Sequence, residues 1–451
     1  MIFTAEQLAQ GAHGQLMSGG VPGGVCTDTR AIQAGDWFLA IRGERFDAHN
    51  FLDKAIEAGA TGVIAEEVQP GWNAGYIKVA DGLTALQNIG RFARTRFDGP
   101  VVGITGSAGK TTTRALVGLA LAELGTVHQT AGNYNNHIGL PLTLLAAPAD
   151  AQAWVLEMGM NHSGEIALLQ EIGRPTIRII TNVGIAHLEG LGSIEAIAKA
   201  KGELFDGARP GDICCINMDD PHVVNLTIPH GVQTLRYGAH PDSDLRLMSA
   251  HVDPDNLNTH FVVQAAGQQV SGMIPNPGLH MAHNAVAAMS VGLALGLDLS
   301  GMTKRIAQYA PVGMRLRIEP GPRGTKVIND AYNANPMSVE ANLNMLAAIP
   351  AGEGRRRIAL LGDMLELGPT EIAQHREIAE IATTLGLDLI AFAGPRFTEA
   401  VGSTHTCAPD AETLGAIIQD ALRPGDIILI KGSRGMAMER LLKTIALEET
   451  N

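Results

Sequence analysis

The sequence is short of aromatic residues and of positive charge. Aromatic side chains make up 4% of its 451 residues, which disfavours a nucleic-acid surface built from stacking platforms. The formal net charge is −13, and no basic run is longer than Arg355–Arg357, so broad electrostatic binding to nucleic acid or to an anionic membrane is not expected. Anionic ligands must therefore be held by local features, such as helix N-termini and single Lys or Arg side chains.

Cysteine is also scarce, and the chain has no long apolar run. The four cysteines form no C-x-x-C pair, and no histidine cluster has zinc-site spacing. Cys214 and Cys215 lie within the apolar run Ile213–Ile216, which predicts reduced core residues; the others are Cys26 and Cys407. The N-terminus lacks the features of a signal peptide, and no apolar run of about 18 residues could span a bilayer. We therefore expect a cytoplasmic protein with no membrane insertion.

What the sequence does contain is an alternation of strand-like and helix-like segments. Its length exceeds a single core and predicts several domains. Expected strands at 101–105, 154–158, 177–183 and 212–216 are separated by helical segments, which is typical of parallel-sheet units. The alternation repeats after residue 313. We predict an α/β protein with three domains: a small α/β domain (1–80), a central parallel-sheet domain (81–312) and a C-terminal Rossmann-like domain (313–451).

The stretch GITGSAGKTTT, residues 103–113, is similar to a phosphate-binding loop but departs from the common G-x-x-x-x-G-K-[ST] pattern. Ile104 stands where that pattern has its first glycine, which leaves a shorter core, G-x-x-G-K-T, from Gly106 to Thr111. A strand-like run precedes the loop and a helical run, Lys110–Leu124, follows it. This context is the one a phosphate loop needs, because the helix N-terminus supplies free N–H groups and partial positive charge.

The loop residues have distinct expected roles. Gly106 and Gly109 let the backbone curl around phosphate oxygens, Lys110 reaches the terminal phosphates, and the hydroxyl of Thr111 can take a Mg²⁺ position. We interpret the segment as a variant nucleotide-binding loop rather than a glycine-rich turn beside an exposed lysine.

A carboxylate and an imidazole follow the next two expected strands. Glu157 lies at the end of the 154–158 strand, and His187 lies four residues after the 177–183 strand. Ligands of open parallel sheets bind at the carboxyl ends of strands, so both side chains are candidates for a second divalent-metal site. Taken singly, each residue is more often an ordinary strand-end charge or loop residue than a metal ligand.

Lys201 is placed unusually. On the helix expected over 193–206, Lys201 falls in the middle of an apolar stripe, whereas Lys199 points the opposite way. Burial lowers the pKa of a lysine and leaves a neutral, nucleophilic amine, which could react with CO₂ to form a carbamate and so become a metal-binding anion. The alternative is a lysine whose amine reaches solvent past its apolar neighbours.

These motifs together resemble the Mur ligase family, whose loop has the form T-G-x-x-G-K-T and is matched by Thr105–Thr111. Further matches are the G-N-x-N-N segment beginning at Gly132, an H-N-x-x-N motif at His280–Asn284 in which Met281 replaces the first Asn, and the hinge arginine Arg315. The resemblance implies an ATP-dependent amide ligase. It also implies Mg²⁺ ions, two per site, with a carbamylated lysine at Lys201.

The resemblance assigns roles to individual residues. Catalytic roles fall to Lys110, His187 and Lys201, and metal-binding roles to Thr111, Glu157, His187 and Lys201. ATP binding falls to Gly106, Ser107, Ala108, Gly109, Lys110, Thr111, Thr112, Asn284, Arg315 and Asp330. Substrate binding falls to Thr29, Arg30, Asn135, Asn136, Asn333, Asn335 and Arg434.

Three stretches resemble one branch of the family, which adds D-alanyl-D-alanine to UDP-N-acetylmuramoyl-tripeptide. They are DAYNANP at 330–336, LGDMLELG at 361–368 and KGSR at 431–434. The N-terminal segments Asp28–Arg30 and Asp36–Asp47 are similar to its UDP-precursor-binding domain, although Ala48 replaces a glycine of that pattern. The resemblance implies a monomer that works in peptidoglycan synthesis, and hence in cell shape and division.

The expected chemistry also follows from elementary principles. A carboxylate does not form an amide until its oxygen becomes a good leaving group, and transfer of the ATP γ-phosphoryl group supplies one as an acyl phosphate. Lys110 and metal ions would offset the crowded negative charge. Two alternatives remain at this stage: a folylpolyglutamate synthase-like ligase, which would lack the UDP-binding N-terminal domain, and a nucleotide-switched regulatory ATPase.

Overall fold

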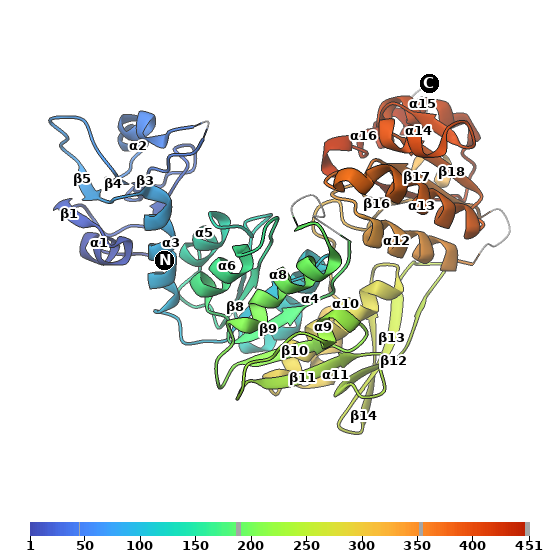
Figure 1. Cartoon of the computed structure of the whole chain (residues 1–451), viewed down its shortest axis with the longest axis horizontal. Coiled ribbons are helices and arrows are strands. Elements are labelled where there is room, and N and C mark those ends of the chain that lie inside the picture. The colour runs from blue at the N-terminus through green and yellow to red at the C-terminus, as the bar shows by residue number, and fades with distance from the viewer. Residues whose placement is uncertain (45, 186–190, 351–354, 447–451) are drawn as a thin grey trace.

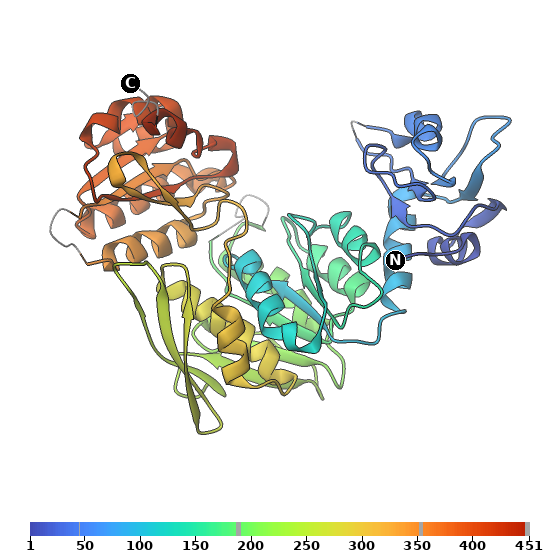
Figure 2. The same cartoon turned by 180° about the vertical axis from the view of Figure 1, so that it is seen from behind.

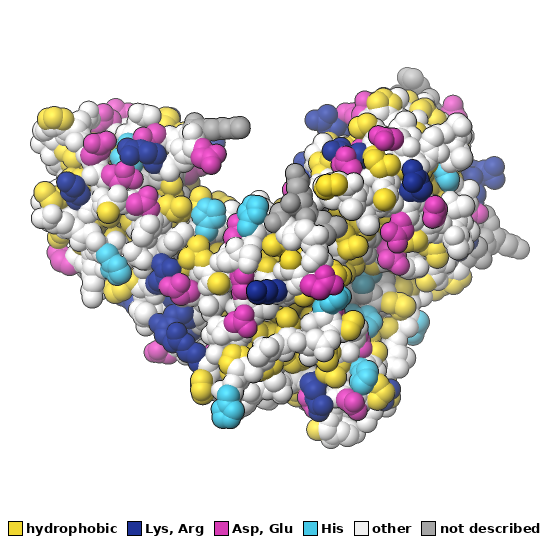
Figure 3. Space-filling view, in the orientation of Figure 1, with side chains coloured by type: hydrophobic (Ala, Val, Ile, Leu, Met, Phe, Trp, Pro, Cys, Tyr) yellow, Lys and Arg dark blue, Asp and Glu magenta, His cyan; other side chains and the backbone are white. Residues whose placement is uncertain are grey.

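The computed structural model describes residues 1–44, 46–185, 191–350 and 355–446, and its strands form three separate sheets. The sheets follow one another along the chain, with five, nine and six strands. The first and the last stand apart above the second (Figures 1 and 2). Figure 3 shows the same outline as two raised lobes with a hollow between them. The predicted α/β class with three domains is confirmed.

The N-terminal sheet has the order β1-β5-β4-β3-β2, and only the β1–β5 pair is antiparallel. Trp37 and Phe38 on β3 point to opposite faces, and each fills one of the two small cores of this sheet. The elements are α1 (Ala5–Ala12), β1 (Gln15–Ser18), β2 (Val25–Cys26), β3 (Trp37–Leu39), α2 (Leu52–Glu57), β4 (Gly62–Ala65), β5 (Gly75–Lys78) and α3 (Gly82–Arg94).

Helix α3 joins the first sheet to the second. Asp81 caps its N-terminus by accepting a hydrogen bond from the Thr84 N–H, and its apolar residues include Leu86, Ile89 and Ala93. These side chains share a core with α1 and with Leu145 of the central region, and α3 also packs against α5 and α6. The helix therefore packs in the N-terminal core and also against two helices of the central region.

The central sheet has the order β14-β13-β12-β11-β10-β9-β6-β8-β7. Its strands are β6 (Val101–Thr105), β7 (Val127–Gln129), β8 (Ala153–Glu157), β9 (Ile177–Ile180), β10 (Ile213–Asn217), β11 (Gln233–Gly238), β12 (Leu245–Val252), β13 (Thr259–Ala265) and β14 (Gln268–Ile274). Its helices are α4 (Lys110–Ala120), α5 (Gly139–Leu145), α6 (Glu165–Gly173), α8 (Ile194–Asp206), α9 (Pro221–Val224), α10 (Leu279–Ala294) and α11 (Leu299–Ile306).

Helices cover both faces of the parallel part of this sheet. Val102 and Ile104 of β6 face α4 and α10, whereas Val101 of the same strand shares a core with α5, α6 and α8. Strands buried on both faces read as continuous apolar runs, which is why the sequence identifies them. Cys214 and Cys215 are buried in β10, as predicted.

The central sheet departs from the sequence prediction in two ways. The strands β12, β13 and β14 add an antiparallel meander to an otherwise parallel sheet, so the sheet is mixed. In addition, β9 ends at Ile180, so residues 181–183 of the expected strand belong to the loop that follows it. Within the described ranges, no helix is long and apolar enough to cross a membrane.

The C-terminal sheet has the order β15-β16-β20-β17-β18-β19 and is parallel except for the β15–β16 pair. Its strands are β15 (Arg317–Pro320), β16 (Lys326–Asp330), β17 (Arg357–Gly362), β18 (Leu389–Ala393), β19 (Thr406–Ala408) and β20 (Ile427–Lys431). Its helices are α12 (Pro336–Ala348), α13 (Glu371–Thr384), α14 (Pro395–Val401), α15 (Ala411–Ile418) and α16 (Arg440–Ala446).

Candidate active site

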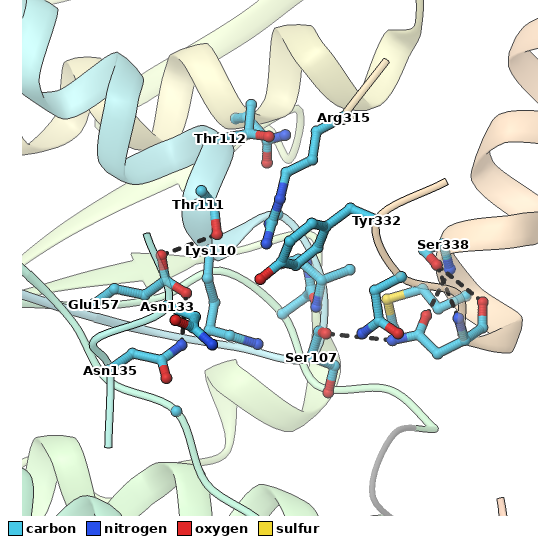
Figure 4. A pocket seen from close by; sticks show the side chains of 18 of the residues that line it. Ser107, Lys110, Thr111, Thr112, Asn133, Asn135, Glu157, Arg315, Tyr332 and Ser338 are labelled. Atoms are coloured by element: carbon cyan, nitrogen blue, oxygen red, sulfur yellow. Dashed lines mark hydrogen bonds between the residues drawn. The ribbon is translucent and has the colours of Figure 1, made fainter. Parts of the chain in front are cut away.

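A cavity of about 530 Å³ lies between the central and C-terminal regions. One wall consists of the loop after β6, the end of β8 and a residue of α8; the other consists of Arg315, the 330–342 segment and the end of β20. Figure 4 shows Lys110, Thr111 and Glu157 on the first wall, facing Arg315, Tyr332 and Ser338 on the second. The carboxyl ends of strands from both sheets therefore meet at this cavity.

The loop between β6 and α4 needs its two glycines for steric reasons. Gly106 has φ +153°, and a Cβ there would lie 1.9 Å from Thr181 Oγ1. Gly109 has φ +78°, in the left-handed region that favours glycine. The loop is also held from outside: Ala108 N donates to Asn182 Oδ1 at 2.9 Å, and Ser107 Oγ donates to the Gly184 carbonyl at 2.9 Å. The loop is thus fixed before any ligand binds.

Lys110 begins α4 and points across the loop. Its Nζ donates to the Gly106 carbonyl at 2.6 Å. Desolvation by the surrounding protein lowers its pKa, Arg315 lowers it further, and the Glu157 carboxylate acts in the opposite direction. Phosphate oxygens would restore the favourable environment that the ammonium lacks, so the geometry suits an anionic ligand in this loop.

Glu157 is 3% exposed and has both carboxylate oxygens occupied. Thr111 Oγ1 donates to Oε2 and Asn135 Nδ2 donates to Oε1, each at 2.9 Å. These carboxylate, hydroxyl and amide oxygens are the hard donors that Mg²⁺ prefers, and a single carboxylate suffices where phosphates supply further ligands. Consistently, no group of three or more His, Cys, Asp or Glu residues that could hold a metal is found in the described ranges.

Lys201 of α8 is 1% exposed and lines the cavity, whereas Lys199 is exposed, as the apolar stripe predicts. Burial lowers the pKa of Lys201 well below its usual value, and the neighbouring Lys110 lowers it further. None of the described residues is within hydrogen-bonding distance of its amine. A carbamate would convert this buried, unpaired amine into an anion beside Lys110, so the surroundings fit that modification.

The C-terminal wall is built differently, because its carboxylate Asp330 is paired with the buried Lys431. Asp330 accepts a hydrogen bond from Leu316 N at 3.1 Å and another from Asn342 Nδ2 at 2.6 Å. The same carboxylate forms an ion pair with Lys431, the last residue of β20, which is 3% exposed. Lys431 also donates to the Asn333 carbonyl at 3.0 Å.

An aromatic residue, Tyr332, and an amide residue, Asn335, complete this wall. The Arg315 guanidinium lies over the ring of Tyr332, 4.2 Å from its centroid (Figure 4). Asn335 caps α12 through a reciprocal pair of hydrogen bonds with Ser338, and its Nδ2 donates to the Ser107 carbonyl at 3.4 Å. Asn335 therefore links the C-terminal wall to the phosphate loop directly.

Most of the residues selected from the sequence line this cavity. They are Ser107, Ala108, Gly109, Lys110, Thr111, Thr112, Asn135, Asn136, Glu157, Lys201, Asn284, Arg315, Asp330, Asn333 and Asn335. Gly106 contributes its carbonyl to Lys110. His187 lies outside the described residues.

Three selected residues lie elsewhere. Arg434 is not among the lining residues; its side chain is 57% exposed and pairs with Glu439 at 2.7 Å. Thr29 and Arg30 belong to a loop of the N-terminal lobe, where Arg30 forms an exposed ion pair with Asp28. The structure thus separates a reaction cavity from a distant surface loop.

The sequence did not single out several residues of the site. Tyr332 and Lys431 lie within motifs that were recognised, but only packing shows that one contacts Arg315 and the other Asp330. Asn182 was counted as part of a strand. His280 also lines the cavity, and burial lowers its pKa to about 4.

Comparison with known proteins agrees with this geometry. Residues 104–292 match the Mur ligase middle domain, and residues 314–434 match the Mur ligase, glutamate ligase domain. The chain is 36% identical over 435 residues to the UDP-N-acetylmuramoyl-tripeptide--D-alanyl-D-alanine ligase of Bacillus subtilis (strain 168), covering 94% of this chain and 93% of the relative.

Two solved structures are similar over nearly the whole chain. The crystal structure of MurF from Acinetobacter baumannii has a TM-score of 0.91 at 28% identity and covers 99% of both chains. MurF ligase from Thermotoga maritima in complex with ADP has a TM-score of 0.84 at 28% identity, covering 94% of this chain and 97% of that one. The chain belongs to the Mur ligase family. It is an ATP-dependent amide ligase.

Proposed function

We propose that the protein joins D-alanyl-D-alanine to UDP-N-acetylmuramoyl-tripeptide, with ATP converted to ADP and phosphate, as a cytoplasmic step of peptidoglycan precursor synthesis. The observation that carries the proposal is the cavity itself. The Lys110–Glu157–Lys201 cluster lies opposite the segment 330–336 and Lys431, which carry the motifs of this branch. Relatives named for this activity match over nearly the full length of the chain.

The reaction proceeds in two stages. The terminal carboxylate of the tripeptide attacks the γ-phosphorus of ATP, which forms an acyl phosphate and releases ADP. The amine of D-alanyl-D-alanine then attacks the acyl carbon, the amide bond forms, and phosphate leaves with the loss of a proton from nitrogen. Lys110 holds the phosphates through both stages, and the loop N–H groups at the start of α4 assist it.

Thr111 and Glu157 would hold Mg²⁺, and a second Mg²⁺ would bind in the same cavity. The family resemblance adds His187 as a further ligand. Bound Mg²⁺ supplies charge neutralisation at the transferring phosphoryl group. Lys201, whose pKa is lowered by burial, would take up CO₂ through its neutral amine and lose a proton to become a carbamate. The resulting anion lies beside Lys110 and helps to fix the metal site.

The remaining roles divide between the walls. Asn284, Arg315 and Asp330 bind the nucleotide, together with Thr112 and the loop. Tripeptide and dipeptide contacts fall to Asn135, Asn136, Asn333, Asn335 and Arg434. Arg434 lies outside the cavity in this structure, so its role requires the C-terminal domain (313–451) to move toward the central domain (81–312) and exclude water.

The N-terminal domain (1–80) binds the UDP portion through Thr29 and Arg30. Asp28 supports this role, because its carboxylate accepts hydrogen bonds from both Arg30 Nε and the Arg30 backbone N–H and so holds the exposed guanidinium in one orientation. A pre-oriented guanidinium is suited to the diphosphate of a nucleotide sugar. We propose that the enzyme acts as a monomer.

The test is phosphate release from ATP, scanned across UDP-muramoyl peptides with and without D-alanyl-D-alanine. We expect release only when UDP-N-acetylmuramoyl-tripeptide and the dipeptide are both present, with the pentapeptide product seen by mass spectrometry. Release driven by a folate substrate would favour the folylpolyglutamate synthase-like alternative. Steady ATP turnover with no carboxylate substrate would favour a nucleotide-switched ATPase.

A further inference from the structure

Arg114 is a buried charge to which the reaction above assigns no role. It lies on α4, one turn after Lys110, and its side chain is 5% exposed. It does not line the main cavity, so it reaches the site from behind the helix. Burying a guanidinium is costly unless it is paired, and its Nε has no hydrogen-bond partner in the described structure.

The guanidinium makes two polar contacts with described residues, one with Glu157 and one with the backbone of Gly132. Its Nη1 lies 3.5 Å from Glu157 Oε2, and the same nitrogen donates to the Gly132 carbonyl at 3.4 Å. Oε2 is also the oxygen that accepts from Thr111 Oγ1. Gly132 begins the segment that carries Asn135, and Asn135 holds the other carboxylate oxygen. Arg114 therefore contacts both Glu157 and the segment whose Asn135 holds this carboxylate.

We propose that Arg114 is a positioning residue for metal–nucleotide binding: it holds Glu157 and the 132–136 segment in place from behind the cavity, without contacting the nucleotide. The inference rests on the proposed function, since it takes Glu157 as a metal ligand. A carboxylate ligand is effective only in a fixed orientation, and partners behind metal ligands change metal affinity by roughly 10- to 100-fold. The 3.5 Å contact suits this role, because Arg114 competes with a metal for Oε2 less strongly than a close ion pair would.

The geometry predicts the direction in which metal affinity changes when Arg114 is removed. If Arg114 only competed with metal for Glu157, its removal would strengthen metal binding. If it positions the carboxylate, its removal weakens metal binding and leaves nucleotide binding without metal unchanged. The two roles are thus separated by the sign of the effect.

The experiment measures binding of ADP to the full-length protein by calorimetry, once with Mg²⁺ and once with excess chelator, and of Mn²⁺ with ADP by electron paramagnetic resonance. For Arg114→Met we expect metal-dependent ADP binding about 10-fold weaker, with chelator values within about twofold of the wild type. Arg114→Lys keeps the charge and should lie within about threefold of the wild type.

A matched control is Arg305→Met. Arg305 also pairs with a glutamate, Glu123, at 3.0 Å, but on α11 and away from the cavity. This variant should leave both binding constants unchanged. If Arg114→Met does not fold, Arg114→Gln provides the same neutral comparison.

A double-mutant cycle tests whether Arg114 affects metal binding through Glu157. On the Glu157→Gln background, Arg114→Met should cause no further loss of metal-dependent binding, because the carboxylate through which it acts is gone. Unchanged or tighter metal binding in Arg114→Met overturns the proposal, as does an equal loss with chelator or an additive loss in the double variant. None of these measurements uses the peptide substrates, so failure of the proposed ligase activity would be seen separately, as absent phosphate release by the wild type.

Discussion

The two walls of the cavity handle charge in opposite ways. On the central wall, Lys110 and Arg114 lie beside one buried carboxylate, Glu157, so positive charge is in excess around it. On the C-terminal wall, Asp330 and Lys431 neutralise each other. The excess indicates a wall that awaits anionic phosphates, whereas the paired charges indicate a wall whose ions fix the position of backbone and side chains. Removing charge should therefore abolish activity on one side and reduce stability on the other.

The sharpest test of this contrast is Lys110→Ala. We expect activity to fall by roughly 1,000-fold or more, because the lysine offsets phosphate charge, while the fold is retained. Coupled phosphate-release kinetics and the midpoint of thermal unfolding measure the two properties. Near-normal turnover of this variant would contradict a role for Lys110 in binding phosphate. A much lower midpoint of thermal unfolding would show that the lysine stabilises the fold instead.

The opposite outcome is expected for Lys431→Met. It leaves the partly buried Asp330 without its counter-ion, which should cost about 3 kcal/mol of stability. Differential scanning calorimetry measures the loss. Combining it with Asp330→Asn should recover part of the stability, since the unpaired charge is then gone. If the double variant is less stable than Lys431→Met alone, the pair is not the structural unit described here.

Lys201→Ala tests whether the excess positive charge is reduced by carbamylation. We expect roughly a 100-fold loss of activity, partly recovered by acetate or another small carboxylate that replaces the carbamate. Lys199→Ala, on the exposed side of the same helix, is the matched control and should be near normal. Full activity of Lys201→Ala, or a bare ammonium seen in crystals grown near neutral pH with bicarbonate and nucleotide, would contradict the carbamate.

The smallest expected effect is a dependence of stability on pH that arises from His280. Its pKa is lowered to about 4 in the folded protein, so the unfolded chain binds the proton more readily. The neutral ring therefore contributes stability above about pH 6.5 that is lost as pH falls toward 4. Because solvent reaches part of the ring, we expect about 1 kcal/mol between pH 8 and 5. Chemical denaturation of the wild type and His280→Gln at both values should show this difference; parallel curves would contradict it.

A region could be predicted from the sequence where its contacts join residues close together in the chain. Where they join distant residues, it could not. The loop from Gly106 to Thr111 could be predicted because strand, glycines, lysine and helix are adjacent in the chain. The burial of Lys201 could be predicted from helical periodicity alone. The antiparallel strands β12–β14 were not predicted, although residues 259–265 alternate between buried and partly buried positions, because their place depends on pairing beyond β11.

Within the site, the residues that sequence reasoning missed act through partners far along the chain. Lys431 contacts Asp330 across 101 positions, and Arg114 reaches Glu157 from another element. Side-chain type alone does not reveal such pairs. Arg434 illustrates the converse, since a recognised motif places it beside the cavity strand while its side chain pairs with Glu439 at the surface.

Helix α3 has a consequence for the length of substrate that the proposed anchor at Thr29 and Arg30 would accept. Because its apolar face belongs to the N-terminal core and its other side packs against α5 and α6, this helix sets the separation between the N-terminal lobe, which carries the Asp28–Arg30 loop, and the central region (Figure 1). A substrate anchored at that loop can present its reacting carboxylate at Lys110 only if it spans this separation. If the precursor is anchored at this loop as proposed, we expect one that is a residue too short to be bound but not phosphorylated.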